Sequence, residues 1–285
     1  MAITISVLNN KGGTGKTTSV LIISQLLAYL GKKVLVVDFD SQANSSMSLG
    51  HLVIDTSEVI SGMEAPKEPN IAELMKGRYR TKEDVMSVIY PSSIAGIDLI
   101  PASKRHKQTP YNILFNTSAN NNVILKRALQ TVREDYDYIL IDNAPADDIL
   151  TTNSLYASDF IICPANAESY SRKGIEETLD NVLRIKEDFD IPVTVKGVYI
   201  TRVESNTVIF RAIYDELCQS LGDMFFRTYI AKDVKASEAI SQNLPILQYC
   251  PSTRCVFDYA KLLLEMDILN ETDTLCLKKS IGMEE

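Results

Sequence analysis

A glycine-rich segment near the start of the chain has the residue types of a phosphate-binding loop. It reads Asn10-Lys11-Gly12-Gly13-Thr14-Gly15-Lys16-Thr17-Thr18 and follows an apolar run at residues 3–8. In such loops, backbone N–H groups of the glycines surround phosphate oxygens, the last lysine reaches the outer phosphates and the next hydroxyl binds Mg²⁺. We therefore predict a phosphate site over residues 11–18, in which Lys16 binds phosphate and Thr17 binds the metal.

This loop has one lysine more than the usual pattern requires. Asn10 occupies the position of the pattern's first glycine, and Lys11 follows it, five residues before Lys16. A lone lysine at a loop entrance is usually a solvated surface charge. Here its ammonium group would lie at the rim of a site for a highly charged anion, which favours a role in phosphate binding.

Three aspartates stand where apolar runs end. Asp38 and Asp40 follow four apolar residues at 34–37, and Asp142 ends the run at 138–141. Because side chains alternate along a strand, Asp38 and Asp40 would share a face if extended geometry continued, and both could address one Mg²⁺ site. A single aspartate at a strand end more often caps the next helix. The pair beside a phosphate-binding loop favours function, and Asp142 would then hold Mg²⁺ or its water together with Thr17.

Short β-branched runs alternate with longer amphipathic segments along the chain, which is typical of βαβ units around a parallel sheet. We predict buried strands at residues 3–8, 33–38, 97–100, 138–141, 160–163 and 195–201. Helical spacing of apolar residues predicts helices over residues 17–30, 123–134, 172–188 and 208–221. The glycine-rich loop therefore lies between a strand and a helix, as a phosphate-binding loop must.

Length and composition favour a single α/β domain. The chain has 285 residues, of which 45% are hydrophobic, and we predict one domain over residues 1–270. Residues 55–90 are more polar and are predicted to form a surface excursion with short helices, and residues 271–285 a short, loosely attached tail. No apolar segment approaches the roughly 20 residues that cross a bilayer, and no signal-peptide pattern is present, so we expect a cytoplasmic protein.

Charge and cysteine usage exclude some classes of protein. A net charge of -8 argues against a protein that coats nucleic acid with its whole surface, so any DNA contact must be a local patch. The five cysteines are scattered and form no Cys-x-x-Cys pair, which is typical of reduced thiols. With only His51 and His106, we expect no zinc site.

Read from Lys11 as Lys-Gly-Gly-Thr-Gly-Lys-Thr-Thr, the loop resembles the deviant Walker A loop of the ParA/MinD family of partition ATPases, in particular its ParA/Soj-type members. Residues 38–44, Asp-Phe-Asp-Ser-Gln-Ala-Asn, are similar to the family's second motif, and residues 230–239 resemble a third segment. The chain departs from the family at Ala231, where members have a proline, and at residues 143–146, where they usually have two. The resemblance covers residues 3 to about 266 and implies an α/β, three-layer P-loop NTPase fold with a central, mostly parallel twisted sheet flanked by helices.

The resemblance also implies an ATPase that requires Mg²⁺ and is slow until a partner stimulates it. Lys16 would bind the phosphates of its own ATP, whereas Lys11 would reach the nucleotide of the partner subunit in an ATP-bound homodimer. Asp40 would orient the attacking water, and Asp38 would support the metal held by Thr17 and Asp142. The family places its adenine contact at Ala231 in this chain.

Relatives of the ParA type bind DNA nonspecifically as ATP dimers, and a ParB-type protein bound to a centromere triggers hydrolysis. The resemblance thus implies a nucleoid-associated protein that positions or segregates plasmid or chromosome DNA. Candidate DNA contacts are basic residues in the second half of the chain, although each taken singly is more often a solvated charge. They are Arg172, Lys173, Arg202, Arg211, Arg227, Lys232 and Lys235.

Other functions of the same fold remain as alternatives. The first is a MinD-like ATPase that binds membrane, or one that positions protein cargo. Residues 274–285 have a small apolar face and an acidic end, so they argue against membrane binding. The scattered cysteines argue against an electron-transfer ATPase, and the absence of tyrosine after Tyr259 argues against a bacterial tyrosine kinase.

Overall fold

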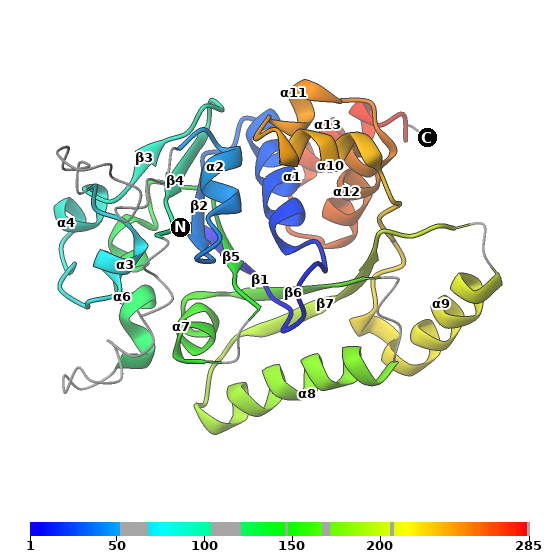
Figure 1. The fold of residues 1–285 in the computed structure, drawn as a ribbon, viewed down its shortest axis with the longest axis horizontal. Helices are drawn as coiled ribbons and strands as arrows, with labels where there is room; N and C mark the ends of the chain where they lie inside the picture. Colours follow the sequence, from blue (N-terminus) through cyan, green and yellow to red (C-terminus); the bar gives the residue numbers. More distant parts are fainter. Residues whose placement is uncertain (52–67, 104–120, 146–147, 167–171, 206–207, 284–285) are drawn as a thin grey trace, which may run out of the picture.

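The computed structural model describes residues 1–51, 68–103, 121–145, 148–166, 172–205 and 208–283, and a central sheet dominates it (Figure 1). Within these residues the sheet has seven strands in the order β3-β4-β2-β5-β1-β6-β7. All neighbours are parallel except β3, which is antiparallel to β4. The strands are β1 (Ile3–Val7), β2 (Val34–Phe39), β3 (Tyr90–Pro91), β4 (Ile97–Ile100), β5 (Tyr138–Asn143), β6 (Phe160–Asn166) and β7 (Thr194–Thr201). The predicted mostly parallel α/β sheet is confirmed.

Helices follow most of the strands. The four predicted helices are present as α1 (Lys16–Tyr29), α6 (Ile124–Val132), α8 (Arg172–Asp188) and α9 (Val208–Leu221). The remaining helices had no individually predicted bounds, although short helices were expected within residues 55–90. They are α2 (Asn44–Ser48), α3 (Ile71–Leu74), α4 (Lys82–Met86), α7 (Ile149–Ala157), α10 (Val234–Ser241), α11 (Ile246–Tyr249), α12 (Arg254–Glu265) and α13 (Glu271–Ser280), with 3-10 turns η2 (Asn121–Val123) and η4 (Gly222–Met224).

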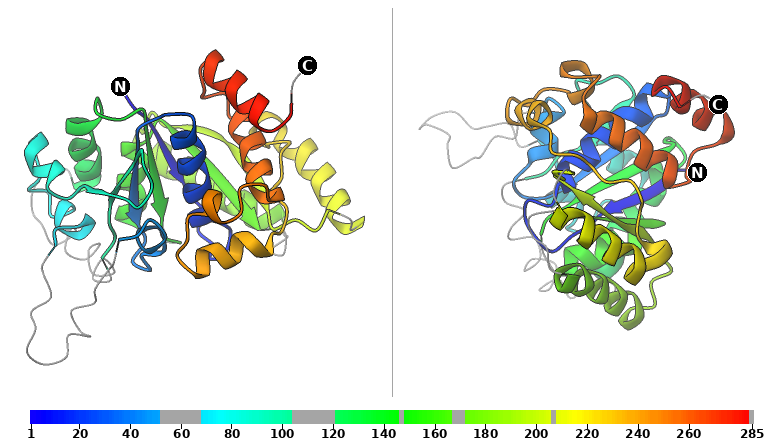
Figure 2. Two further views of the ribbon diagram at one scale, coloured as in Figure 1. Left: turned by 90° about the horizontal axis from the view of Figure 1, so that it is seen from above. Right: turned by 90° about the vertical axis from the view of Figure 1, so that its right-hand side faces the viewer.

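The helices form a layer on each face of the sheet (Figures 1 and 2). Strand β2 shows why, because it is apolar on both sides. Val34 and Val36 pack into the core with α1 and α12, whereas Leu35 and Val37 pack into a second core with α6. A strand buried on both faces is typical of parallel sheets. Both cores therefore follow from the same uninterrupted apolar runs that predicted the strands.

The C-terminal segment is more firmly attached than we predicted. Residues 271–280 form α13, whose Leu277 is fully buried in the core shared with α1 and α12. Asn270 caps this helix, and Lys32 Nζ lies 2.7 Å from Asp273 Oδ2. The prediction of a loosely attached tail is wrong for these residues, because the buried Leu277 and the ion pair between Lys32 and Asp273 hold a helix whose composition is otherwise polar.

The predicted excursion over residues 55–90 is only partly described, since residues 55–67 lie outside the described ranges. The remainder contains the expected short helices α3 and α4. Ile71, Leu74 and Val85 are nevertheless fully buried in the core with α6, so these helices close that side of the sheet. Among the helices that the structure describes, none has the length and apolar character needed to cross a membrane.

Parallel pairing brings three carboxyl ends to one edge of the sheet. β5 lies between β1 and β2, and Asp142 on β5 is in register with Val7 on β1 and with Asp38 on β2. The loop after β1, the turn after β2 and the end of β5 therefore meet. This edge is where ligands bind in open α/β sheets.

Candidate active site

The loop between β1 and α1 is held at several points by backbone contacts. Gly13 and Gly15 have φ angles of +73° and +93°, which side chains other than glycine rarely adopt. Asn9 Nδ2 donates a hydrogen bond to Pro164 O at 2.7 Å, and its Oδ1 accepts one from Lys11 N at 2.8 Å. On the other side, Thr201 Oγ1 donates to Thr14 O at 2.8 Å. Strands β6 and β7 thus support a loop that the sequence alone assigned only to β1 and α1.

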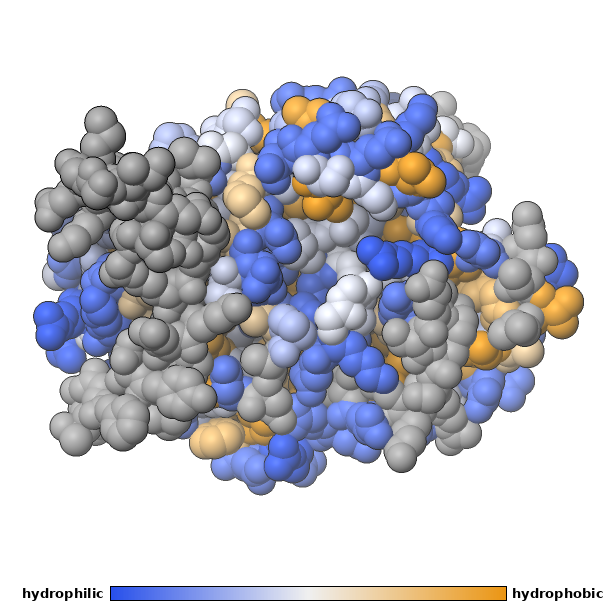
Figure 3. All heavy atoms as spheres, in the orientation of Figure 1, coloured by the Kyte–Doolittle hydropathy of each residue, from blue (hydrophilic) through white to orange (hydrophobic). Residues whose placement is uncertain are grey.

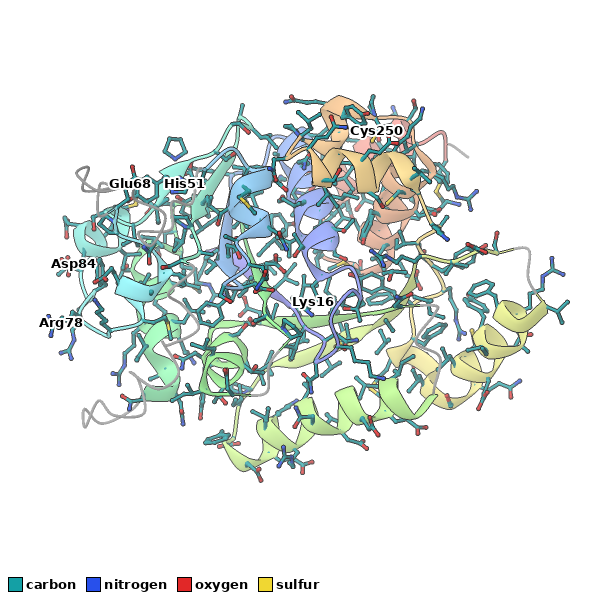
Figure 4. All side chains as sticks on the ribbon, viewed as in Figure 1. Lys16, His51, Glu68, Arg78, Asp84 and Cys250 are labelled. Atoms are coloured by element: carbon teal, nitrogen blue, oxygen red, sulfur yellow. The ribbon has the colours of Figure 1, made fainter. Side chains whose placement is uncertain are left out.

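Lys16, the first residue of α1, points into this loop (Figure 4). Its side chain is buried, and Nζ donates hydrogen bonds to Asn9 O and to Lys11 O, both at 2.9 Å. Burial lowers the pKa of Lys16, and the charges of Asp142 and Asp40 raise it in part. An anion beside this ammonium group would stabilise its charged form.

The space over the loop can take such an anion. A Cβ atom added at Gly12 or Gly13 would meet nothing within 4 Å, so the backbone there is open on its outer side. No side chain caps the start of α1 at Gly15, and Thr17 and Thr18 follow in its first turn. Uncapped N–H groups at a helix N-terminus, together with the helix dipole, favour phosphate. The loop is therefore open over Gly12 and Gly13, next to the uncapped start of α1.

Lys11 differs from Lys16 in its position. Lys11 is exposed, and its ammonium group has no carboxylate partner within the described part of the chain. Its carbonyl oxygen, in contrast, faces inward and accepts the hydrogen bond from Lys16 Nζ. The two lysines of one loop thus point to different places, one inside the loop and one at its outer rim.

Asp142 at the end of β5 is the centre of a hydroxyl cluster. Its Oδ2 accepts hydrogen bonds from Thr17 Oγ1 at 2.8 Å and from Ser45 Oγ at 2.7 Å. Its Oδ1 is buried and has no hydrogen-bond partner among the residues that the structure describes. Burial raises the pKa of Asp142, whereas the bonds from Ser45 and Thr17 lower it. A buried carboxylate oxygen without a partner, beside a threonine hydroxyl, fits a hard cation such as Mg²⁺ or one of its waters.

Both carboxylate oxygens of Asp38 accept hydrogen bonds from the segment that follows β2. Its Oδ2 accepts hydrogen bonds from Ser46 N at 2.8 Å and Ser46 Oγ at 2.7 Å, and its Oδ1 accepts one from Asp40 N at 3.2 Å. Burial, with the charge of Asp142, raises the pKa of Asp38 well above its usual range. Asp38 therefore orders the turn that carries Asp40 and begins α2. Its assignment to the metal site stays a prediction.

Asp40 lies beyond the end of β2. The strand stops at Phe39, and Ala43 has a φ of +59°, so the extended geometry that would place Asp38 and Asp40 on one face does not continue. Asp40 is partly exposed, and its Oδ1 accepts a hydrogen bond from Gln42 N at 2.9 Å. Its charge still acts on both Lys16 and Asp142. The turn therefore brings Asp40 to the same site by another route.

The segment before α10 lies beside β7. Ala231 pairs with Val203, and its N–H donates to Asp258 Oδ2 at 3.0 Å. Asp233 caps α10, and its Oδ2 accepts a hydrogen bond from Cys255 N at 3.3 Å. Helix α12 thus holds this segment through Asp258 and Cys255, two residues that carried no signal in the sequence. The base contact at Ala231 stays a prediction.

The candidate DNA contacts are spread over different elements. Arg211 lies on α9 and Lys235 on α10, and these helices belong to different cores. Lys232 Nζ pairs with Glu204 Oε1 at 2.7 Å. Arg202 and Arg227 are exposed in the connections around η4 and α9, and the side chains of Arg172 and Lys173 lie outside what the structure describes. The seven residues therefore come from several elements, and their role as DNA contacts stays a prediction.

Comparison with known proteins adds independent information. A family model described as an AAA domain matches residues 2–195. The sporulation initiation inhibitor protein Soj of Bacillus subtilis is 30% identical over 262 residues, which cover 92% of this chain and 97% of that protein. The chromosome-partitioning ATPase Soj of Treponema pallidum is 30% identical over 266 residues, which cover 93% and 97%. A Borrelia burgdorferi protein assigned to plasmid partition, solved with AMPPNP, superposes with a TM-score of 0.72 at 25% identity over 93% of this chain and 98% of that one.

Proposed function

This chain belongs to the ParA/Soj family of partition ATPases, and we propose that it hydrolyses Mg²⁺–ATP to time a homodimer that binds DNA. Lys16 and the start of α1 would hold the triphosphate, and Thr17 with Asp142 would hold Mg²⁺. The metal would neutralise charge on the phosphate oxygens. Asp40, which is partly exposed next to Lys16, would orient the attacking water. Phosphoryl transfer asks little more of a protein than such positioning and charge stabilisation.

The observation that supports a dimer is that the two lysine side chains lie in different places: Lys16 is buried in the loop and Lys11 is exposed. Lys16 Nζ is fixed inside the loop by the carbonyl oxygen of Lys11, so the Lys11 side chain leaves on the outer side. A cation at that rim can reach a phosphate that a second copy presents. The charge of ATP would then be fully neutralised only between two subunits, and loss of the γ-phosphate would weaken their contact. ATP would act as a timer for the dimer.

DNA is the cargo that the family membership favours, with a ParB-type protein as the stimulating partner. Exposed basic side chains such as Arg211 and Lys235 would supply phosphate contacts, and dimerisation would double their number. Membrane binding is less well supported. Helix α13 packs Leu277 into the core, and on the face in Figure 3 the exposed hydrophobic residues of the described surface are scattered.

Cosedimentation tests the cargo. We expect the protein to pellet with plain duplex DNA in ATP but not in ADP, and to stay in the supernatant with anionic liposomes. The double variant Arg211→Glu/Lys235→Glu should bind DNA at least about tenfold more weakly and with a smaller salt dependence. The double variant Lys278→Glu/Lys279→Glu on α13 makes the same change in net charge and should bind normally. Pelleting with liposomes alone would favour the membrane alternative, and pelleting with neither would favour protein cargo.

A further inference from the structure

Helix α2 places two adjacent serines against two buried aspartates. Ser45 Oγ donates to Asp142 Oδ2 at 2.7 Å, and Ser46 donates to Asp38 through both its N–H and its hydroxyl. Neither serine has measurable exposure, so neither hydroxyl can bond to bulk water instead. The contact of Ser45 spans 97 positions of the sequence, whereas Ser46 and Asp38 are eight positions apart. These contacts fix α2 against the ends of β2 and β5.

We propose that Ser45 is a positioning residue for the Mg²⁺ site: it holds the carboxylate of Asp142 so that the unpartnered Oδ1 faces the metal or its water. This inference rests on the proposed Mg²⁺–ATP site. Asp142 Oδ2 is held from two sides, by Thr17 on α1 and by Ser45 on α2. Two donors on one oxygen leave the carboxylate little freedom to rotate, and they leave the other oxygen available.

The contribution of Ser45 becomes larger when the site is loaded. Thr17 would then turn a lone pair toward the metal, and its single hydrogen would be all that it could still donate to Asp142. The hydrogen bond from Ser45 does not have to change, because Ser45 has no role toward phosphate in this arrangement. Ser45 is thus the fixed support of Asp142, and Thr17 is the adjustable one. Removing the Ser45 hydroxyl should loosen the carboxylate and leave the loop at residues 11–18 as it is.

A matched control lies on the same helix. Ser48 is also buried, at 2% exposure, but within the described part of the chain its Oγ has no hydrogen-bond partner. Ser45→Ala and Ser48→Ala therefore make the same chemical change in the same helix, and only the first removes a contact with Asp142. Ser45→Cys is a second variant that keeps one heavy atom beyond Cβ but has only a weak donor, and Ser45→Thr keeps a hydroxyl.

The test measures equilibrium binding of a fluorescent ATP analogue as Mg²⁺ is titrated, and again in excess EDTA. We expect Ser45→Ala and Ser45→Cys to need about tenfold more Mg²⁺ for half-saturation, as for one lost hydrogen bond to a charged group. Their binding in EDTA should match the wild type, as should Ser48→Ala in both conditions, and Ser45→Thr should recover most of the loss.

Two results would overturn this role. Wild-type Mg²⁺ dependence in both Ser45→Ala and Ser45→Cys would show that Asp142 needs no support from Ser45. An equal loss of affinity with and without Mg²⁺ would show that Ser45 maintains the loop instead of the metal site. A wild-type protein that binds the nucleotide equally well in EDTA and in Mg²⁺ would contradict the proposed Mg²⁺–ATP site itself, which separates the two failures.

Discussion

Replacement of Lys16 by alanine is expected to abolish detectable binding of Mg²⁺–ATP. The ammonium group lies inside the loop and is buried, so the charge it offers to phosphate is poorly screened by water. Truncating one member of a buried, hydrogen-bonded charge pair costs roughly 2–5 kcal/mol, which corresponds to a loss in affinity of about 30-fold to several thousandfold. Titration with a fluorescent ATP analogue measures this loss.

Lys11→Ala is the matched control, since it removes the same charge from the same loop. It should retain ATP binding by the monomer, because Lys11 is exposed at the rim and only its carbonyl oxygen contacts Lys16. Circular dichroism should show the same helix content for both variants. If Lys16→Ala bound ATP within about threefold of the wild type, the assignment of Lys16 to the phosphates would be wrong.

Replacement of Asp40 by alanine should separate ATP binding from hydrolysis. Asp40 is partly exposed and beyond the end of β2, and its carboxylate contacts Gln42 N but no group of the phosphate loop by hydrogen bond. ATP affinity should therefore change little. Loss of a residue that positions or deprotonates water typically costs about 10²–10⁴-fold in rate, so we expect hydrolysis to fall by about that factor.

The same variant should accumulate as a dimer in ATP, because it does not hydrolyse the bound ATP that holds the dimer together. Light scattering after gel filtration would measure the mass, and Asp180→Ala, at an exposed position on α8, serves as the matched control. An Asp40→Ala protein that binds ATP tightly and remains a monomer would contradict the timer. A variant that still hydrolyses ATP at the wild-type rate would show that another residue orients the water.

Six of the seven described strands could be predicted, because most of their residues are buried and they therefore appear as apolar runs. β2 is the clearest case, with all its residues buried. β3 could not be predicted, because it has two residues and neither is buried. Helix α2 could not be predicted in this way. It has five residues, three of them serines, and a segment that short has no helical periodicity. Helix α13 was missed for a related reason, since Leu277 alone supplies most of its buried apolar surface.

Some residues of the candidate site could be predicted from the sequence, and others could not. Lys16, Thr17 and Asp142 could be predicted from a spaced motif and a strand end, and the structure brings them together. The supports around them depend on tertiary contacts. Ser45 reaches Asp142 across 97 positions of the sequence, and Asn9 reaches Pro164 across 155. A single serine or asparagine carries no sequence pattern that would reveal such a contact, so only the fold identifies these residues.

The central claim is that Lys11 acts on the nucleotide of a second copy, and mixing two defective chains tests it most directly. The Lys11→Ala chain keeps Lys16 and can hold ATP. The Lys16→Ala chain holds none but keeps Lys11. If Lys11 works across the interface, a mixed pair contains one complete site. If Lys11 serves its own loop, the pair contains none.

The measurement is energy transfer between the two chains, each carrying a different fluorophore, with Asp40→Ala added to the Lys11→Ala chain so that ATP persists. In the mixture we predict energy transfer that depends on ATP and is weaker than between wild-type chains. For each variant alone, a batch with the donor dye is mixed with a batch with the acceptor dye, and we predict no transfer. A mixture that shows no transfer under conditions in which wild-type chains pair would contradict the account.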